Sequence, residues 1–316
     1  MPVVDPGWQI RPFTAADQPG VDALLDPDPD RLWAAQGHRL HGEARDGDRW
    51  RRTLVAERAG QVVGAVTVAS NRVHPGRYNL AVEVAAGSRR RGMARALVER
   101  ARLQAPLPLP LAGKVRPADP AGQALLRAVG GRAYQRCPGL CPDPTATEVR
   151  AWAADLSRSG DLAVHPLSEL PAGERAELWV RQYLWVHQDW SPAAEGPLRE
   201  LTRDLVTEAD QESSTITVRD AQVVAVCWVF GAPDHTAEIV CETAERATPG
   251  GVAAVAAGLA RSLSLLAGRG VRSAEIDGHV SDPHLAAVLD TFPPVPRAPL
   301  DLVEIDPAHD EVARQQ

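Results

Sequence analysis

The two halves of this chain carry the same order of strand-like and helix-like segments. In the first half, a short strand at 8–13 and helical segments precede a strand pair at 53–70, a third β-rich run, a helix, a strand and a helix. In the second half, a strand at 162–167 and a helix at 169–187 precede a strand pair at 213–230, and a strand, a helix, a strand and a helix follow. Tight hairpin turns are expected at Ala59-Gly60 and at Asp220-Ala221. Such a repeat predicts an internal duplication, with one α/β domain in each half.

The length of the chain fits two globular domains. Of its 316 residues, 44% are hydrophobic and 24% are charged, which is ordinary for folded proteins. We place the domains at 1–142 and 149–316, with the joint in the segment CPDPTATE. No apolar run approaches the roughly 18 residues of a membrane span, and the segment MPVVDPGWQI lacks the basic start and apolar centre of a signal peptide. We therefore expect a cytoplasmic protein that makes no membrane contact.

The cysteines and histidines form no recognisable metal pattern. Only Cys137 and Cys141 are close in sequence, and a zinc site normally needs four ligands at a recognisable spacing. The histidines in HRLHGE, at 38–43, are more typical of a solvated helix end. We therefore predict no disulfide framework and no metal.

Charge is distributed unevenly along the chain. Residues 1–142 contain 21 Arg and Lys against 13 Asp and Glu, a net +8, whereas residues 143–316 contain 13 against 28, a net −15. A basic half suits a polyanionic ligand, since clustered charge raises the local concentration of its counter-ion. The arginines are not interleaved with aromatic residues, and Lys114 is the only lysine, so we expect no nucleic-acid partner.

The densest positive block, SRRRGMA at 88–94, lies between a β-rich run and a helix. A helix start carries unpaired backbone N–H groups and partial positive charge, so it can hold phosphate groups. Gly92 would let a phosphate approach without a Cβ in the way. The alternative is a surface arginine cluster with no ligand.

The strand, loop and helix around RRRGMA resemble those of the GNAT superfamily of acyl-CoA-dependent N-acetyltransferases. The motif Q/R-x-x-G-x-G/A of that superfamily is matched by Arg89, Gly92 and Ala94. The resemblance covers nearly the whole chain as two units in tandem, although only the first keeps the motif. It implies an α/β (α+β) fold in which each domain is a mixed, mostly antiparallel sheet flanked by helices.

The resemblance also implies acetyl-CoA as the acyl donor. The strand that ends at Val84 would splay from its neighbour and pair with the pantetheine arm, and the N–H of Val84 would donate to the thioester oxygen. At least one of the three arginines would lie over the 3′-phosphate of CoA. The residues implied in binding are Val82, Val84, Arg89, Arg90, Arg91, Gly92, Met93 and Ala94.

The proton acceptor for the attacking amine has three candidates. In some members of the superfamily the base lies six residues before the position of Val84, which here is Tyr78. A phenol with an ordinary pKa near 10 is a poor base, so Tyr78 would instead organise water or contact the substrate. Glu83 is the second candidate, although strand alternation places it on the other face unless a bulge intervenes. His74 is the third.

The position of the proton donor to the leaving thiolate differs in this sequence from the superfamily's pattern. Many members place a tyrosine on the helix after the fifth strand, and the matching position here is about Leu126, which cannot donate a proton. The nearest phenol, Tyr134, is expected on a strand as a packed aromatic residue. Protonation would then fall to water.

The second unit departs further from the motif. In TAERATPGGVA the single arginine, Arg246, lies four residues before Gly250, and Glu242 and Glu245 are alongside. We read this unit as a degenerate copy that shapes the acceptor cleft. Its tryptophans could line that cleft, although their helical spacing is more typical of a core: Trp179, Trp185 and Trp190.

The expected activity is transfer of an acetyl group to an amine of a small molecule. The acidic second half favours a cationic acceptor such as an amino sugar, a polyamine or an amine-bearing antibiotic. Two alternatives stay open: a non-catalytic acyl-CoA-binding or sensing protein, and an acyltransferase that uses aminoacyl-tRNA. The protein is expected to be a monomer or a homodimer.

Overall fold

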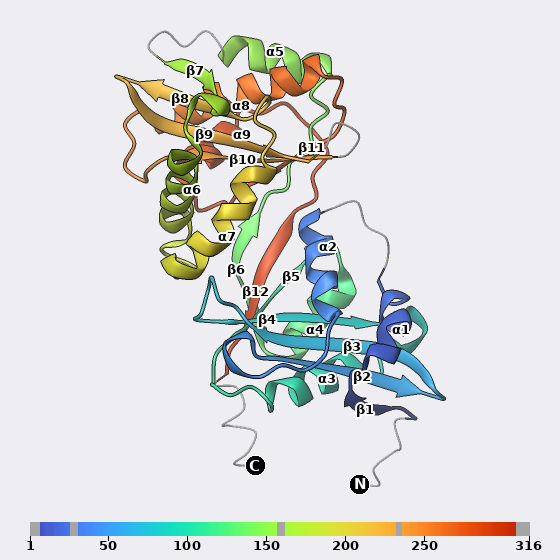
Figure 1. The fold of residues 1–316 in the computed structure, drawn as a ribbon. Helices are drawn as coiled ribbons and strands as arrows, with labels where there is room; N and C mark the ends of the chain where they lie inside the picture. Colours follow the sequence, from blue (N-terminus) through green and yellow to red (C-terminus); the bar gives the residue numbers. More distant parts are fainter. Residues whose placement is uncertain (1–6, 26–30, 157–161, 232–235, 308–316) are drawn as a thin grey trace. The chain divides into compact units, whose positions relative to one another are not determined.

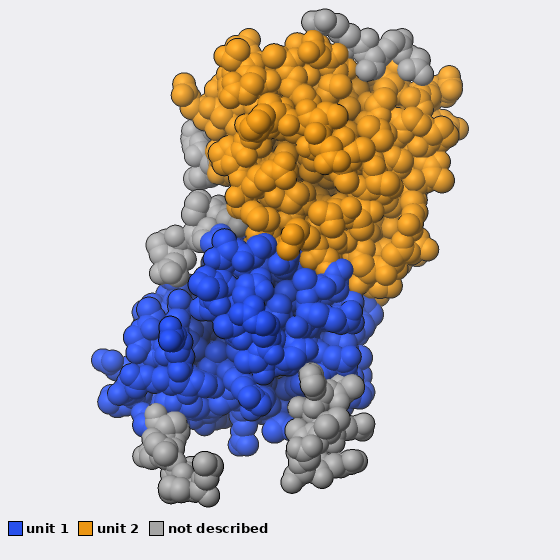
Figure 2. All heavy atoms as spheres, turned by 180° about the vertical axis from the view of Figure 1, so that it is seen from behind, with its two compact units in different colours: residues 1–134, 301–316 blue, residues 135–300 orange. Residues whose placement is uncertain are grey.

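The computed structural model describes residues 7–25, 31–156, 162–231 and 236–307, and the chain divides into two compact units (Figures 1 and 2). The first unit comprises residues 1–134 and 301–316, and the second comprises residues 135–300. The division differs from the boundary expected at 142–149, because the last strand of the chain belongs to the first unit.

The first unit contains a seven-stranded sheet with the order β1-β2-β3-β4-β5-β12-β6. Neighbouring strands from β1 to β4 are antiparallel, β4 and β5 are parallel, and β5 and β12 are antiparallel. The strands are β1 (Gln9–Pro12), β2 (Arg51–Arg58), β3 (Gln61–Ser70), β4 (Tyr78–Val84), β5 (Leu111–Val115), β6 (Gly131–Cys137) and β12 (Leu300–Ile305). The helices are α1 (Gln18–Asp22), α2 (Arg31–Gly37), α3 (Met93–Arg102) and α4 (Pro120–Ala128).

Both faces of this sheet are buried, and alternate strand residues fill the two cores. Val66 and Val84 pack with Leu97 of α3 on one face. Ala65 and Ala81 pack on the other face with residues from α1 and the segment after α2, which include Val21 and Leu40. The period of two along β3 and β4 therefore fixes which side chains point toward α3.

The second unit repeats this arrangement in a five-stranded sheet with the order β11-β10-β9-β8-β7. Neighbouring strands from β7 to β10 are antiparallel, and β10 and β11 are parallel. The strands are β7 (Ala163–Pro166), β8 (Thr215–Arg219), β9 (Gln222–Phe230), β10 (Ala237–Thr243) and β11 (Ala274–Asp277). The helices are α5 (Thr147–Leu156), α6 (Ala172–His187), α7 (Glu195–Glu208), α8 (Gly251–Gly268) and α9 (Pro283–Leu289).

The duplication extends to the detail of the two hairpins. Ala59 and Asp220, the first residues of the two turns, have φ of 49° and 48°. Each hairpin also carries a register shift at the same distance before its turn, between Ala56 and Glu57 in one and between Thr217 and Val218 in the other. The five strands β1 to β5 and the five strands β7 to β11 therefore share their order, their directions and this local irregularity.

The C-terminal strand β12 lies between β5 and β6, in the sheet of the first unit (Figure 1). Ile305 pairs with Leu111 and joins the core beneath α3. Glu304, whose side chain is 6% exposed, is held by Arg77 Nε at 2.9 Å and by Arg132. Strand β12 follows the last helix of the second repeat but belongs to the sheet of the first unit. The expected second domain, 149–316, therefore wrongly included a strand of the first unit.

Helix α8 is the one helix among the described residues that is long and apolar enough to cross a membrane. Length and composition alone give that result, and 61% of the helix is buried inside the protein. Val255, Leu259 and Leu263 pack in the main core of the second unit. The apolar character of α8 is therefore that of a core helix.

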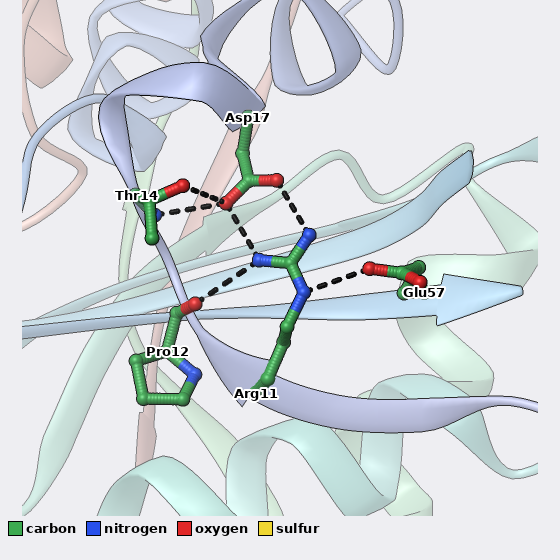
Figure 3. Close-up of polar contacts among 5 residues, drawn as sticks. All are labelled: Arg11, Pro12, Thr14, Asp17 and Glu57. Atoms are coloured by element: carbon green, nitrogen blue, oxygen red, sulfur yellow. Dashed lines mark hydrogen bonds and ion pairs between the residues drawn. The ribbon is translucent and has the colours of Figure 1, made fainter. Parts of the chain in front are cut away.

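An ion-pair network joins β1 to the turn that follows it and to β2 (Figure 3). The Arg11 guanidinium binds both carboxylate oxygens of Asp17, at 2.6 and 2.7 Å, and its Nε lies 2.8 Å from Glu57 Oε2. Asp17 Oδ2 also accepts from the backbone N–H of Thr14 at 2.8 Å. These contacts, above all the Arg11 hydrogen bonds, lower the pKa of Asp17 from 3.8 to about 2.

Replacing Asp17 with Asn should lower the free energy of unfolding by about 1–3 kcal/mol near neutral pH, because a partly buried charge-assisted pair is broken. The pKa of Asp17 is depressed in the folded state, so its contribution is present above pH 3.8 and is lost as pH falls toward 2. The difference between D17N and the parent should therefore shrink between pH 4 and pH 2 in urea unfolding.

Asp22→Asn is the matched control for this prediction, since Asp22 lies on the next turn and its side chain is 55% exposed. It should cost no more than about 0.5 kcal/mol. An equal effect of the two variants, or a D17N effect that does not change with pH, would count against a structural role for the Arg11 and Asp17 pair.

Candidate active site

A cavity of about 360 Å³ lies in the first unit where β4 and β5 separate. The two strands pair only at Tyr78 with Leu111 and at Asn79 with Ala112. Beyond that point, β4 lines the cavity together with residues of α3, α4, β5 and β12; the β4 residues are Leu80, Val82, Glu83 and Val84. The splay expected after the start of this strand is therefore present.

The backbone of β4 presents N–H groups to the open side of the splay. The N–H of Tyr78 donates to Pro110 O on the β5 side at 2.9 Å, whereas the N–H of Ala85 donates to Val63 O on the β3 side at 3.0 Å. Because these groups alternate along a strand, the N–H groups of Val82 and Val84 point away from β3. The carbonyl of Val84 faces the same side and accepts from Arg89 Nε at 2.9 Å.

The loop after β4 delivers the start of α3 to the cavity. Gly92, the N-cap of α3, has φ of 76°, a left-handed conformation that favours glycine. A Cβ built on Gly92 would meet no protein atom within 4 Å, so this residue faces open space. The ten-residue helix α3 therefore begins beside open space at Gly92.

The three arginines of the loop lie in different positions. Arg89 and Arg90 line the cavity, and Arg90 also has a left-handed backbone, with φ of 62°. Arg89 Nη2 lies 4.0 Å from Glu83 Oε2. Arg91 is exposed and lies outside the cavity lining. The other residues implied in acyl-CoA binding all line the cavity: Val82, Val84, Gly92, Met93 and Ala94.

The two candidate catalytic residues on β4 are separated by the alternation of the strand. Tyr78 is 3% exposed, its ring lies 5.2 Å from that of Trp50, and its hydroxyl accepts from the Leu107 N–H at 3.2 Å. It lies outside the cavity lining, so its phenol is not placed to organise water there. Glu83 lines the cavity, and the β3–β4 register runs without a bulge to Val84. His74 also lies outside the lining.

The side that would receive a leaving thiolate carries no phenol among the lining residues. Leu126 of α4 lines the cavity and is 8% exposed, which agrees with its expected place. Tyr134 on β6 lies outside the lining, and the Arg77 guanidinium stacks 4.3 Å from its ring centre. Tyr134 is therefore a packed aromatic residue.

Several lining residues were not anticipated from the sequence. Gln36 of α2 donates through Nε2 to Lys114 O at 3.0 Å and accepts from the Lys114 N–H, so it occupies the β5 edge that β4 leaves unpaired. Val303 and Ile305 come from the C-terminal strand. No local signal identifies these residues, because each depends on a contact between segments that are distant in sequence.

The corresponding helix start in the second unit is blocked by side chains of the chain itself. Gly250 keeps the left-handed conformation, with φ of 62°, but Arg219 Nη2 lies 2.8 Å from the position of a Cβ there. His284 Nδ1 lies 2.5 Å from the position of a Cβ on Gly251. The Trp185 indole donates to Thr243 O at 2.9 Å. Thr243 has the hairpin register position that Val84 has in the first unit, so the Trp185 indole lies on the strand edge that would face a pantetheine arm.

The tryptophans of α6 and the turn after it differ in their surroundings. Trp179 is 7% exposed and packs edge-on against Trp228 and Phe230, so it belongs to a core. Trp185 borders a surface groove between α6 and α7. Trp190 packs against the His187 ring at 4.6 Å.

No protein-family model and no curated protein sequence matches this chain, but solved structures do. A GCN5-related N-acetyltransferase from Sphaerobacter thermophilus matches with a TM-score of 0.63 and 15% identity, over 96% of this chain and 97% of that one. A tandem GNAT protein from the clavulanic acid biosynthesis pathway matches with a TM-score of 0.59 and 18% identity, over 94% and 97%. A GCN5-related glucosamine N-acetyltransferase region of a fungal multi-domain β-N-acetylglucosaminidase matches with a TM-score of 0.60 and 14% identity, over 96% and 38%.

At these low identities, the structural matches show the fold alone. The chain has the GNAT fold in a tandem arrangement that extends over nearly its whole length. The expected class, two mixed sheets flanked by helices, is confirmed.

Proposed function

We propose that this protein is an acyltransferase that moves the acetyl group of acetyl-CoA to an amine of a small molecule. The observation that carries the proposal is the cavity in the first unit, where the open edge of β4 meets the glycine-led start of α3. An open strand edge suits an extended amide-containing arm, and a helix start suits a pyrophosphate.

The residues of the cavity fit acetyl-CoA. Gly92 and the first amides of α3 would hold the pyrophosphate, with Arg89 or Arg90 over a phosphate. The N–H groups of Val82 and Val84 would pair with the pantetheine arm and the acyl oxygen. When bound, acetyl-CoA supplies an acyl group activated as a thioester.

The protein's own groups would act on charge and on the proton. The Val84 N–H would stabilise the negative charge that develops on the carbonyl oxygen. Glu83 would take the proton of the amine, directly or through one water molecule. Leu126 has no proton to give, so water would protonate the leaving thiolate.

The acceptor is proposed to be a small cationic amine. Glu83 is a carboxylate in the cavity lining, and it would attract an ammonium group before deprotonating it. The net charge of −7 and the single lysine favour a small molecule over a nucleic acid. The acidic second half adds to this preference.

The test is release of free CoA thiol from acetyl-CoA in the presence of individual amines. We expect release above the hydrolysis background with particular small amines and none without an amine. Saturable acetyl-CoA binding with no thiol release for any amine of a broad panel would favour the sensing alternative. Transfer of an aminoacyl group from aminoacyl-tRNA to an acceptor, with release of free tRNA and no CoA thiol, would favour the other alternative.

A further inference from the structure

Three potential metal ligands from distant parts of the sequence converge in the second unit. Cys137 ends β6, Asp277 ends β11, and His279 follows two residues later. One ligand atom from each residue, a thiol sulfur, a carboxylate oxygen and an imidazole nitrogen, lies within 4.8 Å of the other two. A thiolate, an imidazole and a carboxylate form a donor set that zinc accepts, and three such ligands leave one coordination position open.

The backbone around these residues is held by hydrogen bonds on both sides. Beside Cys137, Arg136 O accepts from the Val280 N–H at 3.1 Å, and Leu140 O accepts from the Ile276 N–H at 2.8 Å. Gln135 Nε2 also donates to Ser281 Oγ at 2.6 Å. The three ligands are therefore placed by two chain segments that are tied together, and binding would require little reorganisation.

The side chains around the ligands restrict their movement. The His279 ring packs against the Trp190 ring at 4.6 Å and against the His187 ring at 5.4 Å. Gly278, between Asp277 and His279, has no room for a Cβ, since Leu285 Cδ2 lies 2.3 Å from that position. The Leu285 side chain therefore packs directly on the backbone between the two ligands.

The interior near this cluster carries an excess of carboxyl groups. Glu242 and Asp282 are 4% and 2% exposed. Burial raises the pKa of Glu242 well above its usual range, and the negative charges of Asp282 and Asp277 raise it further. Burial therefore favours the neutral form of Glu242, which leaves Asp277 as the carboxyl group that approaches the thiol of Cys137.

We propose that Cys137, Asp277 and His279 form a zinc site with one open coordination position. Cys137 is 5% exposed, whereas Asp277 and His279 are partly exposed, so a metal can arrive from the side of the carboxylate and the imidazole. The site would hold the end of β6 to the end of β11. This inference is independent of the proposed acyl transfer, because none of the three residues lines the cavity in the first unit.

The test uses the full-length protein, freed of metal by a chelator, and titrates it with zinc and with cobalt. We expect one zinc ion per chain with a Kd below about 1 μM, and a thiolate-to-cobalt charge-transfer band in the near-ultraviolet spectrum. Zinc should also raise the unfolding temperature of the parent by several degrees.

Cys137→Ser and His279→Ala should each weaken zinc binding by at least about 100-fold, and the cobalt charge-transfer band should disappear in Cys137→Ser. Cys141→Ser, a change four residues away at a thiol outside the cluster, should bind zinc like the parent. Circular dichroism of the metal-free variants checks that they fold. Two outcomes would overturn the proposal: a parent that binds no zinc at tens of micromolar, or a cobalt band that survives in Cys137→Ser and therefore comes from Cys141, Cys227 or Cys241.

Discussion

Replacing Gly92 with valine is expected to weaken acetyl-CoA binding by about 10–100-fold, because the Cβ would enter the space in which the pyrophosphate meets the first amides of α3. Loss of one hydrogen bond to a charged group costs about 1.5–3 kcal/mol, which corresponds to that range. The fold should survive, since no protein atom lies within 4 Å of the new Cβ position. Isothermal titration of acetyl-CoA measures the loss.

Gly60→Val is the matched control for this experiment. Gly60 and Gly92 have the same φ, 76°, and neither has an atom within 4 Å of a built Cβ. Both variants should therefore lose similar stability from backbone strain, about 1–2 kcal/mol. Only Gly92→Val should lose acetyl-CoA affinity, because Gly60 lies in the β2–β3 turn. Equal affinities of the two variants would show that the ligand does not approach this helix start.

The same titration addresses the second unit. One binding site per chain is expected, because Arg219 and His284 lie against the start of α8 and the Trp185 indole lies on the β10 edge, where a second acetyl-CoA would have to bind. Two sites of similar affinity in the parent would contradict this expectation.

Local sequence signals predicted the strands around the site accurately. The β-rich runs at 78–84 and 111–115 coincide with β4 and β5, and the turn at Ala59-Gly60 has the positive φ values of a tight hairpin. These features depend on neighbouring residues: alternation of side chains, turn formers and a helix start after glycine. The conformation of Gly92 could also be predicted locally, since it depends on the loop that contains this residue.

Local sequence signals could not predict contacts between segments that are distant in sequence. The segment at 300–305 could pair with any open strand edge, and its partner β5 lies nearly 200 residues earlier. Gln36 reads as an ordinary polar residue of a short helix until Lys114 is placed beside it. Likewise, sequence spacing associates Cys137 only with Cys141, whereas the residues that approach its thiol are about 140 positions away. Helix α7 was missed because its buried positions, Leu198, Thr202 and Val206, are set among charged residues.

Replacing Glu83 with glutamine is expected to lower kcat by about 100-fold, the lower end of the contribution of a general base. The amide side chain of this variant would keep the size of the carboxylate but would not accept the amine's proton. The Kd of acetyl-CoA should change little, because the binding groups on β4 are backbone N–H groups. Thiol release with the best amine measures kcat, and titration measures Kd.

Tyr78→Phe is the companion variant, because strand alternation places the side chains of Tyr78 and Glu83 on opposite faces of β4. Tyr78 is buried against Trp50 and bonded to the Leu107 N–H, so removal of its hydroxyl should cost about 1 kcal/mol of stability and leave kcat nearly unchanged. A fall in kcat for Tyr78→Phe with none for Glu83→Gln would reverse the assignment. If neither variant loses rate, the proton leaves by a route that involves neither side chain, and the direct role proposed for β4 is limited to the Val84 N–H.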